Sequence, residues 1–284
     1  MTSTELPVIA GVDGSSPGRE ALDWAAREAL GRGLALVVVH ALQRTRRTGQ
    51  EAQRREAEEL LTESVRRVNE IAPGLHPTTL APLDFPAAAL TALSRAASMV
   101  VVGSRGLGGF RSLMLGSNSL ATASMARCPV VVVHGGQPAE ETAEGFQDVV
   151  AGVAADESSE SVLEFAFEAA ASRPGARLRI VHGWTMFSSM LSGGPVFDRD
   201  AAADSAERTL AELTAGRREE YPAVEVVKEP VNGSASHTLV AASATAALTV
   251  IGRRRGGESL GLGLSPVAQT TLTHARGPVA VVPG

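Results

Sequence analysis

A loop rich in glycine and serine supplies the residues best suited to hold a ligand. Gly103 and Gly106 follow a short apolar run, and their lack of a Cβ lets the backbone approach a ligand closely. Gly116 and Ser117 stand where the next helix is expected to begin, and the unpaired N–H groups of a helix start favour an anion. The hydroxyls of Ser117 and Ser119 would add donors. The pattern predicts a phosphate-binding loop that needs no lysine; the alternative is a glycine-rich loop followed by an ordinary serine N-cap.

A carboxylate follows the first apolar run of the chain. Asp13 lies in the segment Val12-Asp13-Gly14-Ser15-Ser16. If that run is a strand of a parallel sheet, Asp13 lies at the same carboxyl edge as the glycine loop, where it can accept hydrogen bonds from a base or a ribose. The alternative is a residue at a helix start that satisfies backbone N–H groups.

The residues required by several common nucleotide-binding, hydrolase and metal-binding motifs are missing from the sequence. A Walker A loop needs a lysine before a serine or threonine, but Lys228, the sole lysine, is followed by a glutamate. The G-x-G-x-x-G fingerprint, the G-x-S-x-G elbow and the His-Glu-x-x-His helix are missing. The single cysteine, Cys128, excludes an intrachain disulfide and a cysteine metal cluster. His40 and His182 repeat at strand ends, where we predict a structural role, so we expect no catalytic residue and no metal ligand.

Length and composition limit the class of protein. The chain has 284 residues, which favours two domains, and 44% of them are hydrophobic, enough for a core in each. The net charge of −5 argues against a partner nucleic acid held by a basic face. The sequence has no secretory signal and no apolar run near the ~18 residues that a membrane span needs. We therefore expect a soluble, cytoplasmic protein without a membrane partner.

The chain repeats itself. The run Val8–Val12 returns as Val149–Val153, at an offset of 141, and Cys128–Val133 returns as Gly277–Val282, at an offset of 149. So long a period indicates a duplicated domain rather than a solenoid. A Gly/Pro/acidic stretch from Gly135 separates the copies, and we assign the domains to residues 1–137 and 146–284.

Within each copy, short apolar runs alternate with segments of helical periodicity. Uninterrupted Val, Ile and Leu runs are typical of parallel strands covered on both faces. In the first copy we expect strands at 6–12, 34–40, 77–82, 99–103 and 129–133, and helices at 15–29, 51–71, 86–97 and 117–126. The alternation predicts two tandem α/β domains, each with a doubly wound, Rossmann-like parallel sheet that binds ligands at the carboxyl ends of its strands.

The glycine pattern resembles that of a known family. Gly103-x2-Gly106-x9-Gly116-Ser117 is similar to the G-x2-G-x9-G-S/T motif of the universal stress protein family, in its ATP-binding branch. The segment Gly11–Ser15 resembles that family's first strand and adenine-side aspartate. The resemblance covers nearly the whole chain, twice, and implies an adenine nucleotide α-hydrolase-like fold.

The resemblance also implies a set of ligand-binding residues. It places Asp13 with Gly14, and the segment from His40 through Ala41 to Leu42, beside an adenine. It places the loop residues along the ribose and phosphates, and the helix start on the phosphates of ATP, usually with a divalent ion such as Mg²⁺. The loop residues are Gly103, Ser104, Arg105 and Gly106, and the helix-start residues are Gly116, Ser117, Asn118 and Ser119. Asp84 departs from the small residue that the family usually has before the third helix.

The second copy departs much further from the motif. The offset of 141 places Ala154 at the position of Asp13, which predicts that the carboxylate is lost. The offset of 149 places Arg255 at the second glycine and Pro266 at the serine, and proline has neither an N–H nor a hydroxyl to give a phosphate. We read the arginines at 253–255 as a solvated cluster on a degenerate site, the alternative being an anion site of their own.

These patterns favour a stress-response module that binds ATP in its first domain and hydrolyses it slowly at most. One alternative is an interaction or signalling protein that needs no nucleotide. Another is an adenine-nucleotide hydrolase, against which the absence of a Ser-Gly-Gly-x-Asp-Ser loop counts. The resemblance further implies antiparallel pairing of the last strands, Pro129–Val133 and Pro278–Val282, within one chain, with a homodimer as a further option.

Overall fold

The structure is a computed structural model that describes residues 6–43, 47–106, 115–135, 148–154, 156, 158–184, 199–253 and 263–284. The chain divides into two units, which we call unit 1 (Met1–Gly135) and unit 2 (Gly136–Gly284). The stretch between the two assigned domains, residues 138–145, lies outside the described residues. None of the helices in the described ranges is long and apolar enough to cross a membrane.

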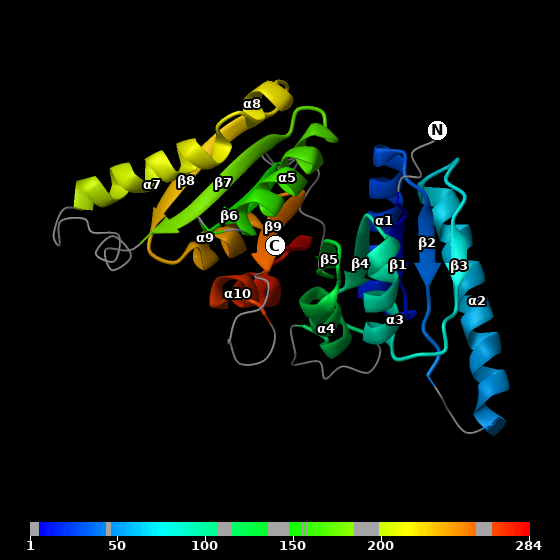
Figure 1. The fold of residues 1–284 in the computed structure, drawn as a ribbon. Helices are drawn as coiled ribbons and strands as arrows, with labels where there is room; N and C mark the ends of the chain where they lie inside the picture. Colours follow the sequence, from blue (N-terminus) through cyan, green and yellow to red (C-terminus); the bar gives the residue numbers. More distant parts are fainter. Residues whose placement is uncertain are drawn as a thin grey trace. The chain divides into compact units, whose positions relative to one another are not determined.

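Unit 1 is a five-stranded parallel sheet with the strand order β3-β2-β1-β4-β5 (Figure 1). Its elements are β1 (Val8–Gly11), α1 (Ser16–Arg32), β2 (Leu36–Val39), α2 (Arg47–Ile71), β3 (Thr78–Leu80), α3 (Pro86–Leu93), η1 (Ser94–Ala96), β4 (Met99–Gly103), α4 (Ser117–Met125) and β5 (Val130–Val133). The chain leaves β1 toward β2 and β3, then returns across the sheet to β4 and β5. Since such crossovers are right-handed, α1 and α2 cover one face and α3 and α4 the other.

The ends of helix α1 follow from its sequence. Ser15 is its N-cap, and the Ser15 hydroxyl accepts a hydrogen bond from the Gly18 N–H (3.1 Å). Gly33 ends the helix at a φ of 68°, a conformation that favours glycine. Between these caps Ala21, Leu22, Ala25 and Ala29 form the buried face, as their spacing predicts.

Unit 2 repeats this architecture with the strand order β8-β7-β6-β9-β10. Its elements are β6 (Val149–Val153), α5 (Ser158–Ala171), β7 (Arg177–Trp184), α7 (Arg199–Thr214), α8 (Arg217–Glu220), β8 (Glu225–Asn232), α9 (Ala235–Ala242), β9 (Leu248–Arg253), α10 (Pro266–His274) and β10 (Val279–Pro283). Each unit therefore has the parallel α/β sheet that the apolar runs predict, and the predicted fold class is confirmed.

The fold brings the candidate residues of unit 1 together. Strands β1 and β4 are parallel neighbours, with Val8 opposite Met99. The connection after β1 leads to β2 on one side of the pair, and the connection after β4 leads to β5 on the other side. Such a topological switch point opens a crevice at the carboxyl ends of the strands. Asp13 follows β1 and the glycine loop follows β4, so both meet at this crevice.

Candidate functional site

A pocket lies at the carboxyl ends of β1, β2 and β4 in unit 1. Seven of the residues expected to bind the ligand line it: Asp13, Ala41, Gly103, Arg105, Gly106, Asn118 and Ser119. His40, which the resemblance places beside the base, also lines it. The pocket has an apolar end, walled by Pro86 and Leu90 of α3, and a polar end toward the start of α4.

Four other expected residues stand behind or beside this lining. Gly14, Ser104, Gly116 and Ser117 do not line the pocket in this structure. Gly14 has a φ of 84° and forms the turn between β1 and α1. The Gly116 N–H donates to the Ser104 carbonyl (2.7 Å), which ties the two ends of the glycine loop together. Residues 107–114, the middle of that loop, lie outside the described residues.

Asp13 is held in place by the first turn of α1. Its Oδ1 accepts hydrogen bonds from the Ser15 N–H (3.0 Å) and from the Ser15 hydroxyl (2.6 Å). Asp13 thus accepts a hydrogen bond from a backbone N–H at the start of a helix, which is the alternative role that the sequence suggested for it. Its second oxygen, Oδ2, faces Gly106, because a Cβ added to Gly106 would lie 2.4 Å from it. One carboxylate oxygen therefore orders the turn, and the other faces the glycine loop in the pocket.

Three glycines allow the close packing around this carboxylate. A Cβ at Gly18 would lie 2.7 Å from Asp13 Oδ1, and one at Gly103 would lie 2.5 Å from the Pro17 carbonyl carbon. Contacts under 3.0 Å do not occur for real Cβ atoms. The role of Gly18 was not predicted; a glycine in a first helical turn, where it lowers helix stability, is the signal that could have pointed to it.

Within the part of the chain that the structure describes, no side chain caps the start of α4, and in this sense the helix start is open. Gly116 is its N-cap and has no side chain to accept hydrogen bonds from the first turn. Ser117 and Asn118, the first two helical residues, are exposed. Ser119 is different: its hydroxyl is buried and donates to the Gly103 carbonyl (2.6 Å), so it supports the loop rather than adding a donor for a ligand. The N–H groups of the first turn and the Ser117 hydroxyl remain as the anion-binding groups.

The matching helix of unit 2 closes its own N-terminus. Ser265 is the N-cap of α10, and its hydroxyl accepts a hydrogen bond from the Ala268 N–H (3.1 Å). Pro266 follows and has no N–H. The same helix start is therefore open in unit 1 and capped by a side chain in unit 2.

The expected loss of the carboxylate from unit 2 is wrong. Ala154 does match Asp13 at the offset of 141, but the equivalent serines are Ser15 and Ser158, at an offset of 143. Two more residues therefore lie between Val153 and Ser158 than between Val12 and Ser15. Asp156 takes the role of Asp13: its Oδ1 accepts hydrogen bonds from the Ser158 N–H (3.0 Å) and from the Ser158 hydroxyl (2.5 Å). Arg254 and Arg255 lie outside the described residues. The two units thus differ at the helix start after the fourth strand, not at the carboxylate.

The two repeated histidines have the structural role expected of them. His40 Nδ1 lies 2.8 Å from the Val12 carbonyl, and His182 Nδ1 lies 3.1 Å from the Val153 carbonyl. A carbonyl only accepts, so Nδ1 carries the proton in each ring. Each histidine joins the ends of two neighbouring strands. Within the described residues, no group of three or more His, Cys, Asp or Glu side chains could hold a metal ion.

Asp84, which stands where the family usually has a small residue before the third helix, does not line the pocket. It is exposed, and its Oδ1 accepts a hydrogen bond from the Phe85 N–H (2.7 Å). The pocket wall at this point is formed by Pro86 and Leu90 instead.

Comparison with known proteins agrees with the repeat. The universal stress protein family matches residues 6–134 and, a second time, residues 145–283. The chain belongs to the universal stress protein family. A universal stress protein of Mycobacterium tuberculosis strain H37Rv is 32% identical over 98% of this chain and 97% of its own length. One from Mycolicibacterium smegmatis is 29% identical over 99% and 98%.

A solved structure supports the fold of both units. The crystal structure of a universal stress protein from Archaeoglobus fulgidus matches with a TM-score of 0.75 and 18% identity, covering 100% of this chain and 99% of that one. At that identity the likeness concerns the fold alone. The chain is thus a universal stress protein with two tandem family domains.

Proposed function

We propose that unit 1 binds an adenine nucleotide, ATP with Mg²⁺, as a regulatory ligand, and that unit 2 does not. The observation that carries this proposal is the contrast between two equivalent helix starts. In unit 1 the first turn of α4 is open beside the pocket, whereas in unit 2 Ser265 caps α10 and Pro266 removes a donor. The open turn supplies N–H groups for phosphates, and the missing Cβ of Gly106 lets the glycine loop pass close to Asp13.

The pocket also suits the rest of a nucleotide. Its apolar end, with Pro86 and Leu90, matches a flat base, and Asp13 Oδ2 lies where a ribose hydroxyl can donate to it. The described residues contain no group of three or more His, Cys, Asp or Glu side chains that could bind a metal ion. Mg²⁺ would therefore be held mainly through the phosphates, whose charge it would neutralise.

Hydrolysis by this pocket would be slow. Its ionisable lining residues are Asp13, His40 and Arg105. Ser15 holds one oxygen of Asp13, and the His40 Nδ1 proton is held by the Val12 carbonyl. Both groups are thus engaged in holding the fold of the pocket, which does not favour either as an efficient general base. The nucleotide would instead act by favouring one conformation of the protein.

Denaturing the purified protein tests the proposal simply. ATP or another adenine nucleotide should be released and be identified by chromatography and mass spectrometry. A protein that carries no nucleotide, and takes up none when Mg²⁺ and ATP are added, would favour the alternative of a nucleotide-independent interaction protein. Rapid release of ADP with multiple turnover would favour the hydrolase instead.

A pair of serine variants should separate binding from helix capping. Ser117→Ala removes one phosphate donor from an exposed helix start and should weaken ATP binding by about 0.5–2 kcal/mol, with little change in stability. Ser265→Ala removes the cap of α10 and should lower unfolding stability by ~1 kcal/mol, with no change in ATP affinity. Calorimetric titration and thermal unfolding measure the two effects, and the reverse pattern would contradict the assignment of the site to unit 1.

The outer edge of β5 has a defined set of backbone groups. The Val100 N–H donates to the Pro129 carbonyl (2.9 Å), and the Ser104 N–H donates to the Val133 carbonyl (2.8 Å). Both carbonyls therefore face β4. Backbone groups alternate along a strand, so the N–H and carbonyl of Val132 face away from β4.

We propose that this edge pairs with the equivalent edge strand β10 of the same chain, antiparallel, as the family resemblance implies. Val132→Pro should remove an outward N–H without breaking the ladder to β4. Small-angle scattering should then show a compact wild type and two lobes of variable spacing in the variant. Two separated lobes in the wild type, or an unchanged profile in the variant, would contradict pairing through this edge.

A further inference from the structure

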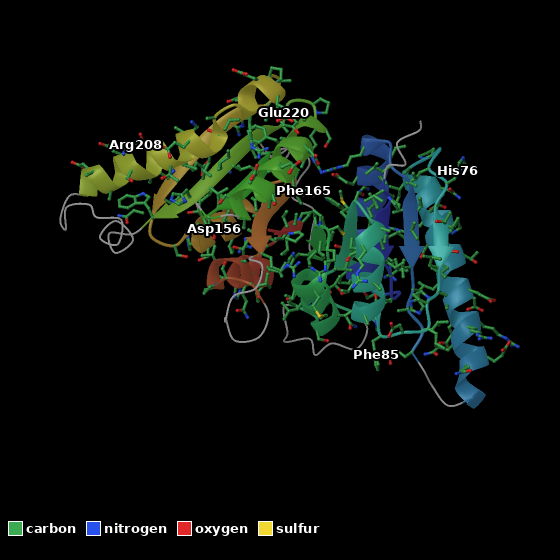
Figure 2. The ribbon with its side chains drawn as sticks, in the orientation of Figure 1. His76, Phe85, Asp156, Phe165, Arg208 and Glu220 are labelled. Carbon is green, nitrogen blue, oxygen red and sulfur yellow. The ribbon has the colours of Figure 1, made fainter. Side chains whose placement is uncertain are left out.

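Phe85 is the most exposed of the large apolar side chains in the described residues, with 70% of its surface accessible. It lies at the start of α3, at the carboxyl-end edge of the unit 1 sheet (Figure 2). The next residue, Pro86, lines the pocket. An aromatic ring is thus held in solvent one residue from the candidate ligand site.

The Phe85 carbonyl accepts a hydrogen bond from the Ala89 N–H (2.9 Å), but the Phe85 side chain does not cap the helix that it begins. It is the N-cap of α3, with φ −65° and ψ 139°, and makes no side-chain capping bond. The equivalent position in unit 2 is Ser234, whose hydroxyl accepts from the Ser236 N–H, the usual arrangement at this position. A phenylalanine at an N-cap position departs from the usual preference for Ser, Thr, Asp or Asn, and it adds no capping bond in exchange. Departures of this kind are expected at functional sites.

The segment that carries Phe85 runs along the apolar end of the pocket. The Leu42 N–H donates to the Pro82 carbonyl (2.8 Å), and Leu42 and Leu83 form a parallel bridge. This places Pro82 and Leu83 beside Leu42, which follows the pocket residues His40 and Ala41 in the chain. The anion-binding start of α4 and Gly106 mark the other end, so a ligand held there by its phosphates would bring its base toward Phe85.

We propose that Phe85 binds the base of the nucleotide, turning over the apolar end of the pocket to stack on the purine ring. The inference rests on the proposed function and adds a specificity residue to it. Exposed side chains change rotamer within about nanoseconds, and the proposal calls for such a rotation of the Phe85 ring. Stacking on an aromatic side chain depends little on which base is present, but it requires a base. Phe85 would therefore increase the affinity for nucleotides relative to phosphate compounds that have no aromatic ring.

Two ligands and three variants test this inference. Phe85→Ser, which installs the cap found in unit 2, should weaken ATP binding about 5- to 100-fold, the range expected when an aromatic partner of a base is removed. Its affinity for inorganic tripolyphosphate should not change. Its thermal midpoint should stay the same or rise by a few degrees, because serine caps a helix better than phenylalanine. Leu30→Ser is the matched control, since it removes an exposed apolar side chain (47% exposed) near the end of α1, away from the pocket residues, and should bind ATP as the wild type does.

Phe85→Trp supplies an optical readout of the same contact. ATP should quench the added indole fluorescence beyond any change seen in the wild type, whereas tripolyphosphate should not. Unchanged ATP affinity in Phe85→Ser, or equal losses for ATP and tripolyphosphate, would overturn the inference and leave the ring as part of a protein-docking surface or a local structural residue. A wild type that binds no ATP would reject the proposed function itself, and this inference with it.

Discussion

Replacing Gly106 with valine is expected to abolish nucleotide binding by unit 1 while leaving its fold intact. A Cβ at this position would lie 2.4 Å from Asp13 Oδ2, and two hydrogen bonds from Ser15 hold that carboxylate at its other oxygen. Relief of the clash would require both the loop and Asp13 to move, and the valine methyls would fill the space left for the ligand. The loss should be about 100-fold or more, since more than one charge-assisted hydrogen bond would be lost.

Gly31→Val is the matched control for this variant. Gly31 lies in α1, and a Cβ there would meet nothing within 4 Å. It should bind ATP with wild-type affinity, and titration calorimetry with circular dichroism compares the two variants. If Gly106→Val binds ATP as tightly as Gly31→Val does, the nucleotide is bound elsewhere.

Gly103→Ala is expected to destabilise unit 1 by about 1–3 kcal/mol, the usual range for overpacking. The added Cβ would lie 2.5 Å from the Pro17 carbonyl carbon, 2.6 Å from its oxygen and 2.8 Å from the Gly18 nitrogen. These are backbone atoms of the first turn of α1, so they can yield only if the helix shifts against β4. Because Gly103 and Gly18 both line the pocket, ATP affinity should fall as well.

Denaturant unfolding measures this change in stability. Trp24 lies in α1 and the other tryptophan, Trp184, lies in unit 2, so a Trp184→Phe background lets fluorescence follow unit 1 alone. Gly31→Ala, an alanine in open space on the same helix, should be neutral or slightly stabilising. Equal midpoints for Gly103→Ala and Gly31→Ala would show that β4 and α1 are not packed as tightly as described.

The fold could be predicted because its central strands, such as β1 and β4, are covered on both faces. Such strands need uninterrupted apolar runs, and the β1 and β4 sequences are of this kind. The duplicated order of those runs predicted two units with the same topology. The end of α3 was harder: its apolar pattern continues to Ala97, but the chain turns into η1 at Ser94, where the Ser94 hydroxyl donates to the Thr91 carbonyl.

The site could be predicted where a residue type has a single geometric reason. Gly103 and Gly106 are such residues, because each stands where a Cβ would collide with a neighbour. Hydroxyls are less specific, and the sequence does not say that Ser119 faces inward while Ser117 faces solvent. Asp156 was missed because the offset between the copies changes from 141 at Val153 to 143 at Ser158, and a fixed offset does not allow for the two added residues.

Calorimetric titration of nucleotide-free protein with ATP and Mg²⁺ tests the difference between the two units most directly. One site per chain is expected, retained in Ser265→Ala and lost in Gly106→Val. Of the two equivalent helix starts, that of α4 in unit 1 is open, whereas that of α10 in unit 2 is capped by Ser265. Two equal and independent sites, or a single site that survives Gly106→Val, would contradict the assignment of nucleotide binding to unit 1.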